Sequence, residues 1–170
     1  MHTVRETQYI HTVRIYIGRY VRVGDAFRRR TEGVVVNLYP VLQTADVAAS
    51  ARFYRVHFGF APTFEADWYV SLRHPLAPHA EIALLDSEHP SIPDGYRERA
   101  RGTLVNIEVD DVDALATRLD AAGVPVVQAL RSEAFGQRHV IVRDPGGVLV
   151  DVITEIPPSA EYVAAFAPNE

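Results

Sequence analysis

The chain has 170 residues, a formal net charge of −5 at neutral pH and no cysteine. The acidic balance argues against nucleic acid as the main partner, since neutralising phosphates requires clustered basic residues. The missing cysteines exclude disulfides, thiolate metal ligands and a cysteine nucleophile, and no apolar run approaches the length of a membrane span. We therefore expect a cytoplasmic protein that needs neither a membrane nor nucleic acid.

Residues 1–33 differ in composition from the remainder of the chain. They hold seven arginines and three acidic residues, and residues 13–21 alternate loosely in the manner of an edge strand. The favoured interpretation is a poorly ordered N-terminal extension. A basic arm that binds an acidic partner is the alternative, and the role of this segment stays open.

A strand–helix–three-strand unit is predicted next. The apolar, β-branched run at residues 34–43 predicts a strand, and Asp46 is a helix N-cap signal. Apolar residues at helical spacing predict a helix over residues 47–58 that ends at Gly59. Three further strands are expected at residues 61–65, 68–73 and 80–85.

The same order recurs after a polar stretch at residues 86–102. A strand is predicted at residues 103–109, then a helix at 112–122 with Asp111 as its N-cap and Gly123 after its end. The remaining expected elements are strands at residues 124–130, 137–143 and 148–153, a turn at 144–147 and a short terminal helix at 159–166.

The two halves of the chain repeat. Asp46 matches Asp111 as a helix N-cap. Arg73 and Arg143 each stand two residues before a proline and are 70 residues apart, and the same offset of 70 aligns Glu81 with Asp151. One such unit buries too little apolar surface to be stable alone. We therefore predict an α+β fold of two tandem βαβββ modules, residues 34–86 and 103–156, whose curved mixed sheets surround a shared cleft, followed by a tail at 157–170.

Three segments carry a family resemblance. Residues 46–60, 105–112 and 135–151 resemble, in that order, the first helix, the second-module opening and the final hairpin of the vicinal oxygen chelate superfamily. This superfamily includes glyoxalases, bleomycin-resistance proteins and extradiol dioxygenases, and the final hairpin is most similar to the bleomycin-resistance branch. The resemblance implies a homodimer and a small-molecule site, in either a metal-dependent enzyme or a metal-free binder.

The resemblance also implies where a metal would bind. Metal-dependent members use two histidines near the module starts and two carboxylates on the last strands. Glu81 and Asp151 stand at the carboxylate positions, but Tyr39 and Leu104 stand where the histidines would be. Leucine has no ligating atom and tyrosine is an uncommon ligand for Zn²⁺. We expect no metal cofactor; the alternative is a divalent ion held weakly by Glu81 and Asp151.

Strand alternation assigns the side chains that face away from the helices into the cleft. Leu38 and Leu42 should face the first helix. The candidate ligand-binding residues are Tyr39, Trp68, Tyr69, Arg73, Glu81, Asn106, Phe135, His139 and Asp151. The two carboxylates need compensating partners, for which Arg73, Arg138, His139 and Tyr69 are candidates. Arg52, Arg55 and Arg118 are interpreted as a solvated helix face, and residues 144–147 as turn chemistry alone.

The favoured function is a metal-free small-molecule-binding protein that sequesters a planar or cationic natural product, as in antibiotic resistance. Concave sites with a few convergent polar groups are typical of such proteins. The alternative is a metal-dependent lyase, isomerase or dioxygenase. A metal-free enzyme with Glu81 or Asp151 as base, and a regulatory dimer with a filled cleft, also stay open. Neither the ligand nor whether a reaction is catalysed follows from the sequence.

Overall fold

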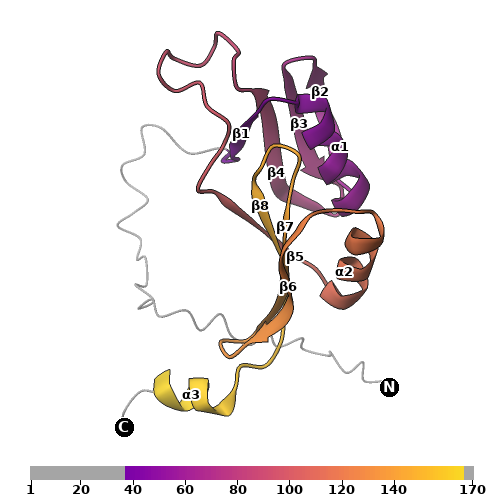
Figure 1. Ribbon diagram of the computed structural model, residues 1–170, viewed down its shortest axis with the longest axis vertical. Coiled ribbons are helices and arrows are strands. Elements are labelled where there is room, and N and C mark those ends of the chain that lie inside the picture. The colour runs from indigo at the N-terminus through magenta and orange to yellow at the C-terminus, as the bar shows by residue number, and fades with distance from the viewer. Residues whose placement is uncertain (1–36, 167–170) are drawn as a thin grey trace, which may run out of the picture. The chain divides into compact units, whose positions relative to one another are not determined.

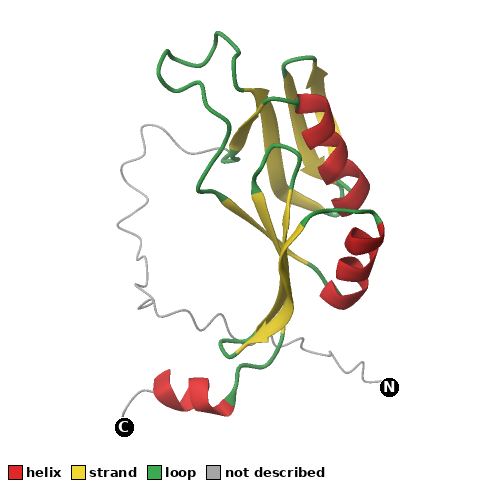
Figure 2. Cartoon of the chain, viewed as in Figure 1, coloured by secondary structure: helices red, strands yellow, loops and turns green. Residues whose placement is uncertain are grey.

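The computed structural model describes residues 37–166, so the predictions for residues 1–33 lie outside the described residues. The elements, in chain order, are β1 (Val41–Thr44), α1 (Val47–Phe58), β2 (Ala61–Ala66), β3 (Tyr69–His74), β4 (Ala77–Asp86), β5 (Leu104–Glu108), α2 (Val112–Ala121), β6 (Val126–Glu133), β7 (Gln137–Arg143), β8 (Leu149–Glu155) and α3 (Ala160–Phe166) (Figures 1 and 2).

The strands form two four-stranded mixed sheets with the same topology. The strand order is β1-β4-β3-β2 in the first sheet and β5-β8-β7-β6 in the second. β1 runs parallel to β4, and β5 runs parallel to β8, while the other neighbours are antiparallel. Each sheet with its helix is one βαβββ module, so the predicted α+β fold of two tandem modules is confirmed.

The two module helices begin and end where their capping residues predict. Asp46 accepts a 2.8 Å hydrogen bond from the amide of Ala49, and Asp111 accepts a 2.9 Å bond from that of Ala114. Gly59 ends α1 in the left-handed region at φ 73°, where glycine avoids a side-chain clash. Among the described residues, no helix is long and apolar enough to cross a membrane.

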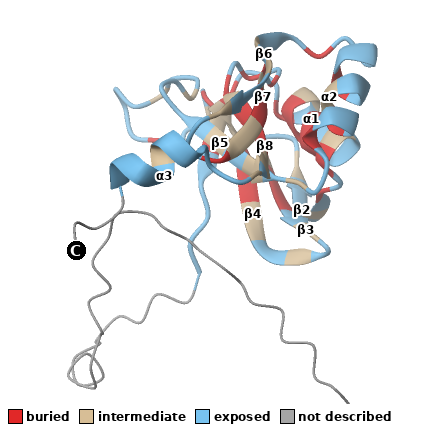
Figure 3. Cartoon of the chain, turned by 90° about the horizontal axis from the view of Figure 1, so that it is seen from below, coloured by how far each residue is buried: buried red, intermediate tan, exposed pale blue. Residues whose placement is uncertain are grey.

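The core lies between the helices and one face of each sheet. Val70, Leu72, Ile82 and Leu84 of the first sheet and Val140, Val142, Val150 and Val152 of the second are buried with the apolar sides of α1 and α2. The buried segments gather beneath the two helices, which lie side by side (Figure 3). The face of each sheet away from its helix is thus available for polar side chains.

The first strand is shorter than predicted. β1 begins at Val41, whereas the apolar run predicted a strand from residue 34. Leu42 is buried as expected, but Leu38 is 86% exposed, so its assignment to the helix side was wrong. Pro40 provides a reason, because proline has no amide hydrogen to donate to a sheet.

The second sheet contains a larger departure. β6 spans Val126–Glu133, whereas residues 124–130 were predicted, and its pairing with β7 shifts register on both sides of Gln128. Such bulges insert unpaired residues and change which side chains share a face. As a result Arg131 pairs with His139, and the end of β6 contributes polar residues to that face.

A buried hydrogen bond connects the two modules. The hydroxyl of Tyr54 on α1, 0% exposed, donates to Asp144 Oδ2 at 3.2 Å. Asp144 Oδ1 accepts a 2.8 Å bond from the amide of Val148, which is the turn interaction that the sequence predicts. The interpretation of residues 144–147 as turn chemistry alone was therefore incomplete, since Asp144 also contacts the first module.

Candidate functional site

A histidine–aspartate pair lies on the face of the second sheet away from α2. His139 on β7 and Asp151 on β8 are each 6% exposed, and Nδ1 of His139 lies 2.8 Å from Oδ1 of Asp151. The carboxylate can only accept this hydrogen bond, so Nδ1 carries the proton. Asp151 thereby fixes the ring orientation and leaves Nε2 to interact with other groups.

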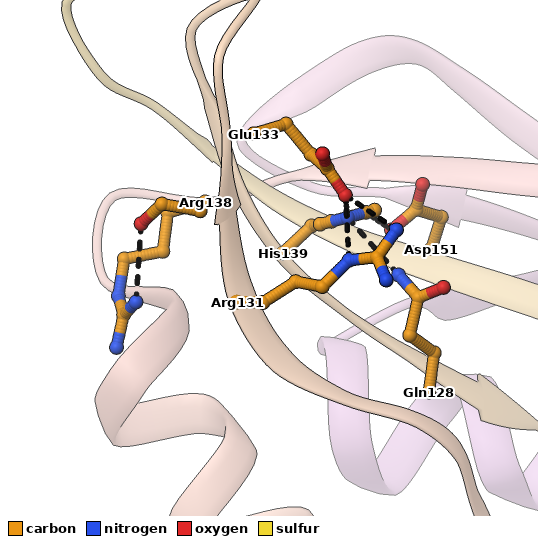
Figure 4. Close-up of polar contacts among 7 residues, drawn as sticks. Gln128, Arg131, Glu133, Arg138, His139 and Asp151 are labelled. Carbon is orange, nitrogen blue, oxygen red and sulfur yellow. Dashed lines mark hydrogen bonds and ion pairs between the residues drawn. The ribbon is translucent and has the colours of Figure 1, made fainter.

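Two polar side chains of β6 reach Nε2 of His139. Gln128 Nε2 lies 3.1 Å away and Glu133 Oε1 lies 3.3 Å away (Figure 4). A neutral imidazole accepts from the Gln128 amide, and a protonated imidazole donates to Glu133. The hydrogen bond with His139, together with the adjacent Arg131, holds the pKa of Glu133 below its usual value. The arrangement thus accommodates both protonation states of the imidazole.

A second polar cluster lies on the first sheet. Arg73 binds Glu81 through Nη2 at 2.9 Å and Nε at 3.2 Å, and the Glu81 side chain is 8% exposed. The hydroxyl of Ser71 is 3.5 Å from the same carboxylate. Burial, then a hydrogen bond with Tyr39, raises the pKa of Tyr69 to about 12, and the charge of Glu81 contributes. The structure therefore brings together four predicted residues: Tyr39, Tyr69, Arg73 and Glu81.

The aromatic candidates have mixed surroundings. Trp68 stacks on His89 of the inter-module segment, with ring centroids 4.0 Å apart and planes 13° apart, and lies 5.6 Å from Tyr69. One face of the predicted stacking platform is therefore covered by an imidazole that the sequence analysis did not single out. Phe135, in the β6–β7 turn, lies beside Tyr162 of α3, with the two ring centroids 6.4 Å apart.

The register corrects the proposed equivalence of Glu81 and Asp151. In the first sheet Val41 pairs with Ala83, and in the second Asn106 pairs with Asp151. Val41 and Asn106 stand equally far before their helix N-caps, so Ala83 is the counterpart of Asp151. Glu81 lies two residues earlier on the same face. The shared offset of 70 follows the repeated turn sequence rather than the strand register.

The residues present do not fit a family-type metal centre. Leu104 offers no donor atom, and the counterpart of Asp151 in the first module is an alanine. The carboxylate of Glu81 already binds Arg73, and that of Asp151 binds His139. Within residues 37–166, no three histidine, aspartate or glutamate side chains are grouped so that they could hold a metal ion.

One predicted partner lies on the wrong side of the sheet. Arg138 was a candidate partner for the cleft carboxylates, but it binds Asp113 of α2 at 2.6 Å and lies on the opposite side of the strands from His139 (Figure 4). Adjacent residues of a strand point to opposite faces. The residues that do surround His139, namely Gln128, Arg131 and Glu133, were missed because the β6 bulges interrupt the alternation from which faces were predicted.

Two tandem βαβββ modules, with polar side chains on the sheet faces away from the helices, define the class of fold. The chain belongs to the Glyoxalase/Bleomycin resistance protein/Dioxygenase superfamily, whose profile matches residues 37–152. No curated protein sequence matches it.

Solved structures share the fold. A lactoylglutathione lyase from Agrobacterium tumefaciens is 25% identical, with 74% of this chain and 95% of that chain covered and a TM-score of 0.57. A glyoxalase/bleomycin resistance protein/dioxygenase from Nocardioides is 19% identical (77% and 89% covered, TM-score 0.59). A glyoxalase-related enzyme from Fulvimarina pelagi is 23% identical (71% and 89% covered, TM-score 0.59).

Proposed function

We propose that this protein binds a planar, cationic small molecule at the polar group around His139 and against the ring of Trp68, without a resident metal ion. The observation that supports this most is the set of hydrogen-bonded polar groups that runs from the buried Asp151 and His139 to the partly buried Gln128 and Glu133. Burying charged groups is unfavourable unless they are paired and hydrogen-bonded. A set of this kind is suited to fixing the polar groups of a ligand.

The local charge favours a cation. Besides the imidazole, the group around His139 contains two carboxylates, Asp151 and Glu133, and one guanidinium, that of Arg131. The chain as a whole carries a net charge of −5. A planar cation could stack on the exposed part of Trp68, since aromatic faces attract cations. Removal of such a ligand from solution would provide resistance to it, as the resemblance to bleomycin-resistance proteins suggests.

Calorimetric titration with proflavine, a planar cation, tests the proposal. One stacked aromatic contributes about 1 kcal/mol beyond its buried area, so Trp68→Ala should weaken binding roughly fivefold to tenfold. Tyr96→Ala, which removes a 73% exposed aromatic ring in the inter-module segment, is the matched control and should change the affinity less than about twofold.

His139→Asn and EDTA complete the test. His139→Asn should weaken binding because Gln128 and Glu133 lose the Nε2 atom that they contact, whereas EDTA should leave the affinity unchanged. If EDTA abolishes binding while Trp68→Ala leaves it intact, the binder proposal is wrong and a metalloenzyme must replace it.

An enzyme of the same superfamily is the second candidate. The observation that favours it is the Asp151–His139 geometry, since a carboxylate that orients an imidazole is a common arrangement for a general base. The lactoylglutathione lyase with the same fold is an enzyme by name. Turnover of a substrate that is lost in His139→Asn and retained in EDTA would support a metal-free reaction.

A further inference from the structure

A cavity on the helix side of the molecule has features of a second ligand site. It has a volume of about 760 Å³ and is bounded by α1, residues 122–125 after α2, the turn at residues 143–147 and Arg99. None of the nine residues predicted to bind ligand lines it. Its volume is within the usual range for small-molecule sites, which is about 300–1,000 Å³.

The cavity wall is cationic. Arg52, Arg99 and Arg143 come from three separate segments and converge on the same space. Within residues 37–166, none of the three forms an ion pair, whereas Arg55, one turn along α1 from Arg52, binds Glu65 at 2.8 Å. Arg52 was interpreted from the sequence as part of a solvated face. Arg52 is exposed, as the sequence predicts, and it adds to a concentration of positive charge beside this cavity in an acidic protein.

The carboxylate in the wall does not neutralise these arginines by direct pairing. Asp144 is 4% exposed, and its two oxygens accept hydrogen bonds from Tyr54 and from the amide of Val148. Burial, followed by the charge of Arg118, holds the pKa of His57, another wall residue, below its usual value. The guanidinium groups of Arg52, Arg99 and Arg143, which form no ion pair among residues 37–166, favour an anion in this cavity.

The remaining wall is apolar. Phe53 and Val124 are buried in the core beside the cavity, Pro125 follows Val124, and Val56 exposes 64% of its surface on α1. A ligand that fits this wall has a flat or aliphatic apolar part next to an anionic group. Guanidinium groups bind carboxylates, sulfonates and phosphates with paired donors, which gives geometric selectivity for such groups.

We propose that this cavity binds a small organic anion, with its acidic group on Arg52 and Arg143 and its apolar part against Val56 and Phe53. The inference does not rest on the proposed function, which concerns the opposite faces of the sheets and a ligand of opposite charge. A ligand here would contact α1 of the first module and the β7–β8 turn of the second, so its binding should stabilise the packing of the two modules.

Calorimetry with naphthalene-2-sulfonate tests the proposal, with 2-naphthalenemethanol as the neutral analogue. We expect saturable binding of the sulfonate with one site per chain and at least about tenfold weaker binding of the alcohol. Arg52→Gln and Arg143→Gln should each raise the sulfonate Kd about fivefold or more. Arg55→Gln is the matched control, because it removes the same charge from the same helix outside the cavity, and its Kd should stay within about twofold of the parent.

Val56→Glu adds a second, steric and electrostatic test. It should abolish sulfonate binding while leaving the thermal unfolding midpoint close to that of the parent chain, because Val56 is exposed. Equal affinity for the sulfonate and the alcohol would overturn the proposal. An unchanged sulfonate Kd in both Arg52→Gln and Arg143→Gln would also overturn it. The same holds if Arg55→Gln loses as much sulfonate affinity as the two cavity variants, or if the sulfonate does not bind at millimolar concentration.

Discussion

The hydrogen bond between Tyr54 and Asp144 allows a quantitative prediction. Tyr54→Phe removes only the hydroxyl, and the Tyr54 side chain is 0% exposed, so water cannot readily replace the lost donor. A hydrogen bond to a charged group contributes about 1.5–3 kcal/mol, and Asp144 retains its bond from the Val148 amide. We expect the free energy of unfolding to fall by about 2 kcal/mol, and the midpoint of thermal unfolding by roughly 4–8 °C.

Urea unfolding followed by circular dichroism measures this loss. Tyr96→Phe is the control, since its ring is 73% exposed, and it should change the free energy of unfolding by less than about 0.5 kcal/mol. A double-mutant cycle with Asp144→Asn isolates the coupling between the two groups. The bond does not stabilise the contact between the modules if Tyr54→Phe is as stable as Tyr96→Phe. The same conclusion holds if the effects of Tyr54→Phe and Asp144→Asn on the free energy of unfolding are additive.

Three further predictions concern stability and assembly. Burial raises the pKa of Asp144 in the folded chain above its unfolded value of 3.8. The protonated carboxyl therefore stabilises the fold below pH 3.8, and this contribution is lost as the pH rises through the folded pKa. In a pH series of urea unfolding curves, the parent chain should lose stability relative to Asp144→Asn over that range. Gly136→Ala should lower the free energy of unfolding by about 1–3 kcal/mol in the same assay, because φ is 102° and the added Cβ would lie 2.9 Å from the backbone oxygen of Ile156. Gly95→Ala is the control, since it is also at positive φ but its Cβ would meet no atom within 4 Å, and it should lower the free energy of unfolding less. Sedimentation should give a dimer of twice 18.9 kDa, because the outer strands of both sheets are paired on one side only among the described residues; a monomer at micromolar concentration would contradict this.

Local sequence signals were sufficient for the elements and their order. Asp46 and Asp111 are N-caps whose carboxylates bind the amides of Ala49 and Ala114, and both interactions depend on residues within one turn. The alternation along β3, β4, β7 and β8 also assigned faces correctly, since a strand without bulges keeps a period of two. The part of the first cluster that lies on β3 and β4, namely Tyr69, Arg73 and Glu81, could therefore be predicted.

The surroundings of His139 could not be predicted in the same way. Gln128, Arg131 and Glu133 reach the imidazole because β6 shifts register twice against β7, and the sequence contains no residue that requires those bulges. Arg138 was wrongly expected to partner the cleft carboxylates, because its actual partner, Asp113, is 25 residues away on α2. Interactions at this separation depend on how a helix packs on its sheet.

The sequence alone thus determined the tandem modules, the helix boundaries and the identity of most polar residues on the sheet faces, because capping, periodicity and turn chemistry act over a few residues. Only the tertiary structure decided the register that makes Ala83 the counterpart of Asp151, the Tyr54–Asp144 bond between the modules and the arginine-lined cavity beside α1. These features join segments that are far apart in the chain, so they depend on long-range packing rather than on local preference.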